Sequence, residues 1–376
     1  MILAFRDGPP DRVDCLGIDI GRLPQKREQI LNFGHRAVSG KCTPEVVDRN
    51  RSSFRALHLT SKRIVRPFEW KSPPTCQSVG IFTDPKRYYG GSMGYSSLGL
   101  SPAPTPDNPP FPAALRLFSA GIIIVLIVGA GLFFAPALVR PRWPWAVTPF
   151  NARFLGGFYT AEMAVMAALL VWNRWSPGRL VLVMAFIFTV IVSAASFINL
   201  GYFNFERKAP WLWFLVYLAS VAVSGLFLLR AGGRPSAKGV TLNSAWRGYM
   251  SMEMAILGLY GVGLLLFPLT FGGFWPWPID AFHAQVYSAI FLAGAGGTYL
   301  VWKSAPHEEL LVLGLAQFLV GLFAILGLVI TEAVMHRIDW TATGTLCWLA
   351  LFGWIGISGI FKLYAVSRYF SAQSAS

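Results

Sequence analysis

Residues 116–138 read RLFSAGIIIVLIVGAGLFFAPAL, and this apolar run decides the fold. A helix needs about 20 mainly apolar residues to cross the hydrocarbon core of a bilayer. Because lipid offers no hydrogen-bond partners, the backbone of such a segment must bond within its own helix. The run therefore predicts a membrane-spanning helix.

Similar runs recur to the end of the chain. Soluble core helices are a poor alternative, because these runs leave almost no polar face for water. The chain is 54% hydrophobic and only 13% charged, against roughly a quarter charged in soluble proteins. We predict an all-α integral membrane protein with eight transmembrane helices. The predicted spans are 116–138, 153–172, 179–200, 211–230, 248–269, 282–302, 309–333 and 343–366.

The spans contain an internal duplication. Trp143-Pro144-Trp145 recurs as Trp275-Pro276-Trp277, an offset of 132 residues (275 − 143 = 132). The same offset relates GLFFAP at 131–136 to GLLLFP at 263–268 and FNAR at 150–153 to FHAQ at 282–285. VWN at 171–173 matches VWK at 301–303 at an offset of 130, which suggests a two-residue deletion in the second copy. A fixed period is the signature of repeats.

Each copy holds four spans, so both copies enter the membrane from the same side. We therefore expect two parallel four-helix repeats related by an axis along the membrane normal, at residues 111–232 and 248–370. Between them, residues 233–247 form a basic hinge loop that we place in the cytoplasm.

Residues 1–110 show neither a helical period nor strand alternation. They are expected to be a mostly disordered, basic tail that ends in the Pro-rich segment 101–113. The tail has two interpretations: a cytoplasmic segment that touches anionic headgroups, or untranslated sequence before a start at Met93.

Lys and Arg in the loops set the expected orientation. Without the tail, nine lie on one side and six on the other, so we place both termini in the cytoplasm of a bacterial cell with the spans in its inner membrane. The formal net charge of +14 fits anionic lipid headgroups, and no nucleic-acid-binding signature accompanies it. The lipid bilayer is thus the expected partner. The nine are Arg174, Arg179, Arg230, Arg234, Lys238, Arg247, Lys303, Lys362 and Arg368, and the six are Arg140, Arg142, Arg153, Arg207, Lys208 and Arg337.

The Trp-Pro-Trp loops fall on the outer side. Because tryptophan favours the headgroup zone, Trp143, Trp145, Trp275 and Trp277 are expected to be interfacial anchors, with an aromatic ligand platform as the alternative. The stretch 143–153, WPWAVTPFNAR, resembles a motif of uncharacterised bacterial multi-pass membrane proteins. The resemblance covers only this stretch, and it implies a membrane fold without a particular activity.

Ionisable groups at membrane depth are costly and suggest function. Glu162 lies in the middle of the second span, and Glu253 lies early in the fifth. Glu162 is a candidate proton or cation site, or else a protonated carboxyl bonded to a neighbouring helix. Glu253 is a weaker candidate because it could face the headgroups. Their repeat counterparts are Gly294 and Gly121, so neither acid is duplicated.

A second polar group gathers near the outer face. His283 starts the sixth span, and Glu332 and His336 share a helix face at the end of the seventh. Imidazoles and carboxylates are zinc ligands, so these three form a candidate metal site, although their spacing matches no known metal signature.

No cofactor-binding motif is present, so no cofactor is expected. Glycine clusters predict close helix packing, and contact within a homo-oligomer is their alternative use. Three hypotheses follow: a structural or accessory membrane protein, a small-solute or proton-coupled transporter that uses Glu162, and a membrane enzyme or metal protein that uses the His/Glu group. An enzyme is the less favoured class.

Overall fold

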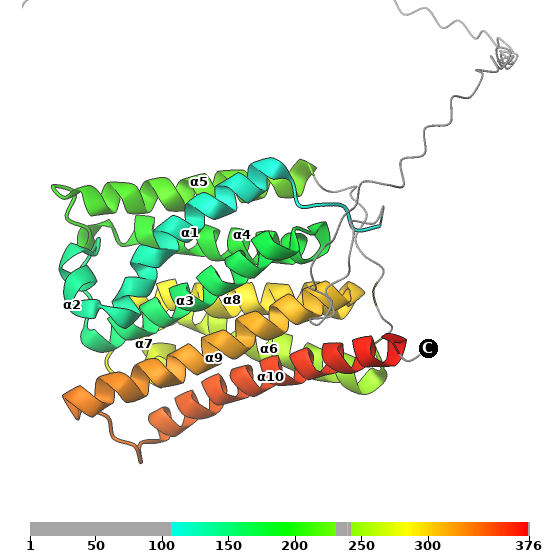
Figure 1. Ribbon diagram of the computed structural model, residues 1–376. Coiled ribbons are helices and arrows are strands. Elements are labelled where there is room, and N and C mark those ends of the chain that lie inside the picture. Colours follow the sequence, from blue (N-terminus) through cyan, green and yellow to red (C-terminus); the bar gives the residue numbers. More distant parts are fainter. Residues whose placement is uncertain (1–106, 231–238, 240–241, 375–376) are drawn as a thin grey trace, which may run out of the picture. The chain divides into compact units, whose positions relative to one another are not determined.

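The computed structural model describes residues 107–230, 239 and 242–374. Within these residues, eight helices are long and apolar enough to cross a membrane, which confirms the eight predicted spans. Figure 1 shows the long helices lying side by side in one bundle. The predicted tail up to residue 106, with Met93, lies outside the described residues, as do positions 231–238 and 240–241 of the loop between the halves.

The long helices are connected by short turns and short helices. The long helices are α1 (Ala113–Phe134), α3 (Pro149–Trp172), α4 (Trp175–Ile198), α5 (Lys208–Arg230), α6 (Ser244–Leu266), α8 (Ala281–Ser304), α9 (His307–Met335) and α10 (Thr343–Ser374). The short elements are α2 (Pro136–Val139), η2 (Arg140–Arg142), η3 (Leu200–Tyr202) and α7 (Pro268–Gly272).

Two prolines end the first and fifth spans earlier than the apolar pattern predicts. The residue before a proline is pushed out of the α region. Ala135 accordingly adopts φ −135° and ψ 57°, and Phe267 adopts φ −126° and ψ 57°. Each break starts a short helix, α2 or α7, with the proline in its first turn.

Helices α3 and α8 are built alike. Each has 24 residues, and the side chain of its N-cap residue, Thr148 or Asp280, accepts a hydrogen bond from a backbone N–H. Each ends on a left-handed residue, Asn173 at φ 49° or Ala305 at φ 39°. Both helices start and end at positions 132 residues apart, with Trp172 and Ser304 as their last residues, so the expected two-residue deletion does not shorten the later helix.

Four helices form the centre of the bundle. α3 packs against α9, and α4 packs against α8; we call these contacts the central seam. Outside it, α1 packs on α3 and α6 on α8, while α5 packs on α4 and α10 on α9. The contacts of the first four long helices are therefore mirrored by those of the last four.

The chain just before α1 is packed against the bundle. The Asn108 side chain accepts a hydrogen bond from the backbone N–H of Ser176 at 2.9 Å and donates one to Glu308 at 3.3 Å. Phe111 is buried. The last residues of the expected linker are therefore part of the folded unit, because they satisfy free N–H groups at the start of α4.

The contact between α9 and α10 depends on small residues. A Cβ at Gly321 would lie 2.6 Å from the Phe352 carbonyl oxygen and 2.7 Å from the Gly356 backbone, whereas a Cβ at Gly353 would meet nothing within 4 Å. Gly321→Ala should therefore push the helices apart and lower the unfolding free energy by about 1–3 kcal/mol.

Thermal unfolding of the purified protein in detergent measures this effect. Gly353→Ala is the matched control and should leave the midpoint unchanged or slightly higher, because alanine favours helix. Equal effects of the two substitutions would contradict the packing.

Candidate functional site

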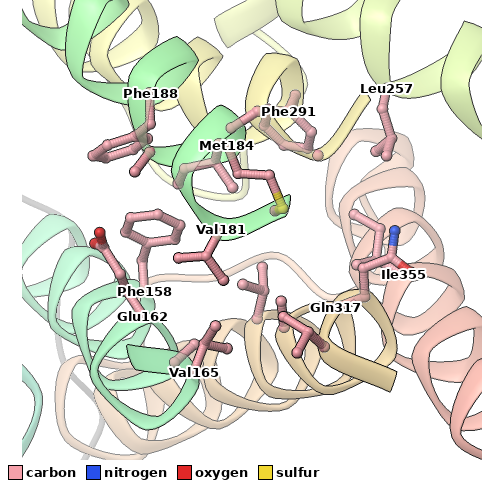
Figure 2. Close-up of a pocket in the computed structure, with 18 residues that line it drawn as sticks. Phe158, Glu162, Val165, Val181, Met184, Phe188, Leu257, Phe291, Gln317 and Ile355 are labelled. Carbon is pink, nitrogen blue, oxygen red and sulfur yellow. The ribbon is translucent and has the colours of Figure 1, made fainter. Parts of the chain in front are cut away.

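A cavity of about 100 Å³ lies at the central seam. Figure 2 shows its lining side chains, which come mainly from the four seam helices. Six pairs of lining residues are separated by 132 positions, so both halves of the chain contribute to its wall. These pairs are Phe158 and Ile290, Ala161 and Ala293, Glu162 and Gly294, Met184 and Ala316, Ala185 and Gln317, and Phe188 and Val320.

Among the residues that the structure describes, Glu162 is the only ionisable side chain that lines this cavity. It occupies position 14 of the 24 residues of α3, close to the middle of the span. Within the described residues its carboxyl group makes no hydrogen bond and no ion pair. Glu162 therefore faces a cavity between the halves, and no hydrogen bond to a neighbouring helix closes it off.

A smaller cavity of about 40 Å³ adjoins the other side of Glu162, toward α1 and α5. Four hydroxyl side chains line it: Ser119, Thr189, Ser220 and Ser224. The last three donate to carbonyls of their own helices. Glu162 therefore stands between an apolar cavity and a more polar one.

The second polar group of the large cavity is Gln317, which lies at the far side from Glu162 in Figure 2. Its amide donates to Glu253 Oε1 at 2.9 Å and accepts from Lys362 Nζ at 2.7 Å. The cavity is thus one side chain away from a buried ion pair.

That ion pair joins Glu253 on α6 to Lys362 on α10. Lys362 Nζ lies 2.9 and 2.8 Å from the two carboxylate oxygens, and both side chains are fully buried. Ser358 donates to Glu253 at 2.7 Å. The Tyr249 ring centroid lies 5.6 Å from the ammonium. Every polar atom of this network has a partner, as a charge pair in lipid requires.

Two expectations need correction here. Glu253 does not face the headgroups; it is buried because Lys362 reaches it from α10. Lys362 is therefore not a loop charge and does not count toward orientation. The sequence carried a usable signal, since Ser358 and Lys362 are spaced i, i+4 on one helix face.

A second ion pair crosses the seam at the end of the bundle where α10 ends. The Arg179 guanidinium on α4 binds both carboxylate oxygens of Glu309 on α9, each at 3.0 Å, and Ser304 accepts a further bond at 3.2 Å. Glu309 is fully buried, whereas the Arg179 side chain is 25% exposed. Sequence reasoning treated Arg179 only as a loop charge and missed this pair.

The Trp-Pro-Trp loops join the two halves by hydrogen bonds. Trp145 Nε1 donates to His283 Nε2 at 3.1 Å, and Trp277 Nε1 donates to Asn151 Oδ1 at 2.7 Å. Donors and acceptors are both related by the offset of 132, so each half donates to the other. Trp145 also packs on Phe282, and Trp277 stacks on Phe150.

The expectation that these tryptophans anchor the protein in the headgroups is wrong. All four are buried, at 3–7% exposure. They pack on each other and on Trp213 and Trp348, which occupy equivalent places in α5 and α10. Their large apolar faces are used inside the protein instead of at its lipid boundary.

The expected metal site does not form. In the part of the chain that the structure describes, no three His, Cys, Asp or Glu side chains are grouped as ligands. The His283 ring donates from Nδ1 to Asp280 at 2.8 Å and accepts from Trp145, so both ring nitrogens are used. Glu332 accepts the backbone N–H groups of Arg337 and Ile338 beyond its helix. His336 is the exposed left-handed cap of α9.

Asp280 fixes the His283 ring from outside the span. Partial burial by itself would raise the pKa of Asp280, but hydrogen bonds from the ring and backbone N–H of His283 lower it below its usual value. Asp280 is therefore an ionised partner that holds the proton of His283 on Nδ1 and leaves Nε2 free to accept from Trp145.

Comparison of the chain with protein-family models, curated proteins and solved structures finds no match. The candidate site rests on its own geometry.

Lys362→Met would leave Glu253 charged and unpaired, and we expect a loss of about 3–5 kcal/mol in unfolding free energy. The double variant Glu253→Gln, Lys362→Met removes both charges and should be much less destabilised. Unfolding of the detergent-solubilised protein distinguishes the two. An equal loss in the single and double variants would contradict a buried charge pair.

Proposed function

We propose that the membrane part consists of two parallel four-helix repeats, 111–232 and 248–370, around a pseudo-twofold axis through the cavity. The mirrored packing and the reciprocal tryptophan bonds support this proposal. So do two further bonds: Arg153 donates to the Phe133 carbonyl, and its counterpart Gln285 donates to that of Leu265. With Lys362 removed, the basic loop residues count eight against six, which keeps both termini on the cytoplasmic side of an inner membrane.

We propose that this protein is a proton-coupled transporter of a small solute, with Glu162 as the shared binding group. The observation that carries the proposal is the unpaired Glu162 carboxyl at a cavity between the halves. An ionised carboxylate in an apolar site is very costly without a partner. Glu162 therefore holds either a proton or a bound cation, and exchange of one for the other keeps the site neutral.

The lining indicates the class of solute. Apart from Glu162 and Gln317, all lining residues are apolar, and three are the phenylalanines Phe158, Phe188 and Phe291. Aromatic faces attract cations. An apolar cavity of about 150 Å³ holds benzene, so one of about 100 Å³ suits a small alkylammonium ion. A purely structural role would instead leave Glu162 dispensable for binding.

Proton and ammonium compete for one carboxylate, so affinity for methylammonium, whose N–H groups can donate to that carboxylate, should rise with pH. Glu162→Gln should weaken its binding at least about tenfold and remove the pH dependence. Isothermal calorimetry on the purified protein tests binding, and ammonium-driven proton release from proteoliposomes tests exchange. Glu206→Gln, an exposed acid in the α4–α5 connection, is the matched control. Unchanged binding in Glu162→Gln would refute the proposal.

The carboxyl group can also be moved across the axis. Gly294 lies at position 14 of α8, lines the same cavity, and has space for a side chain, since a Cβ there meets only Leu257 at 3.4 Å. The double variant Glu162→Gln, Gly294→Glu should therefore recover pH-dependent ammonium binding. Glu162→Gln, Gly294→Gln is the uncharged control. A double variant no better than this control would contradict the equivalence of the two positions.

A further inference from the structure

A second hollow lies away from the central cavity, where the Trp-Pro-Trp loop of the first half meets the α4–α5 connection. This cleft has a volume of about 620 Å³, within the range of ligand sites. Arg140 and Arg207 line it together with Tyr202 and Asn204, and no acidic side chain is among its lining residues. The cleft is therefore a positively charged hollow at one end of the bundle.

Both guanidinium groups are held by the walls of the cleft. Arg140 donates from Nε and Nη2 to the Val147 carbonyl at 3.1 and 2.9 Å, and Arg207 donates from Nη2 to the Pro141 carbonyl. Neither arginine has a carboxylate partner among the described residues. A guanidinium carries five N–H donors, so each retains donors for a ligand. Their positions are set in advance, which lowers the entropic cost of binding.

The Trp-Pro-Trp turn can form without the two arginines of the cleft. The counterpart of Arg140 at the offset of 132 is Gly272, and the counterpart of Val147 is Ile279. A Cβ at Gly272 would lie 3.1 Å from Ile279, so the second turn closes by direct packing. The counterpart of Arg207, at the offset of 135 that relates Trp213 to Trp348, is Ala342. Two arginines that only one half carries are better explained by a ligand than by the turn itself.

The surroundings of the cleft indicate an amphiphilic ligand. Exposed apolar side chains lie close to its lining residues in the sequence: Leu138, at 60% exposure, follows the lining residue Ala137 on α2, and Trp211, at 63%, lies in the first turn of α5, which begins just after Arg207. The Trp211 indole donates to the Phe205 carbonyl, which holds it at the helix end. Arginine pairs bind phosphate oxygens through charge-assisted hydrogen bonds. We propose that this cleft binds the phosphate group of an anionic phospholipid, with the acyl chains lying along α2 and α5.

A ligand in this cleft would lie beside a hydrogen bond that joins the two halves. Trp145 forms part of the cleft wall, and the same indole donates to His283 of the other half. A bound headgroup therefore contacts the side chain that joins the two halves, independently of what the central cavity binds.

The test is the thermal unfolding midpoint of the purified full chain in detergent, with phosphatidylglycerol, phosphatidylcholine or inorganic phosphate added. Phosphatidylglycerol should raise the midpoint of the wild type, because a ligand that binds the native state stabilises it. In Arg140→Gln, Arg207→Gln the apparent affinity should fall at least about tenfold for each arginine removed. Arg142→Gln is the matched control, since this neighbouring exposed arginine does not line the cleft.

Each outcome of this experiment either supports or overturns lipid binding in the cleft. Loss of the shift in the double variant and its retention in Arg142→Gln support the proposal. An equal shift in the wild type and the double variant, or an equal loss in Arg142→Gln, overturns it. A wild-type shift by inorganic phosphate equal to that by phosphatidylglycerol overturns the lipid as occupant. If the double variant does not fold, Arg207→Gln serves in its place, because that arginine lies at the exposed rim.

Discussion

A charged side chain buried among eight apolar helices has lost its water, so it needs a partner inside the protein. Glu253 and Lys362 show how far this constraint shapes the structure, because two full charges are tolerated only with Gln317 and Ser358 completing the network. Glu309 meets the same requirement through Arg179. Against these two paired acids, the unpaired carboxyl of Glu162 stands out as the acid that a proton or a ligand has to complete.

The same requirement explains how the halves hold together. Lipid supplies no hydrophobic drive between helices, so the seam depends on packing and on hydrogen bonds that cross it. Trp145 and Trp277 provide two such bonds at one end, each donated by one half to the other. In both bonds the donor is a tryptophan of a loop and the acceptor lies in the first turn of a helix. The same local arrangement therefore supplies both bonds.

The sequence predicts the eight spans, since long apolar runs depend on composition and length alone. It also points to Glu162, because an acidic residue in the middle of an apolar run can be recognised from the sequence alone. It does not predict partners that lie on different helices. Lys362 lies near the end of its predicted span, where it was counted as a loop charge, and only the packing of α10 on α9 carries it to Glu253. The tryptophans were misplaced for the same reason: an aromatic residue in a loop favours a headgroup and a protein core alike, and the facing half decides between them.

The arrangement of bonds along the seam bears on how a solute would reach Glu162. At the Trp-Pro-Trp end, two hydrogen bonds and a cluster of buried rings would all have to separate. At the other end, the Arg179–Glu309 pair crosses the seam, and its guanidinium already meets solvent at 25% exposure. As this end opens, water can reach both charges, whereas opening the aromatic end exposes a layer of apolar rings to water. In the proposed transport cycle, the end with the ion pair is therefore the one that opens at the lower cost, and a headgroup bound beside Trp145 would widen that difference by stabilising the closed aromatic end.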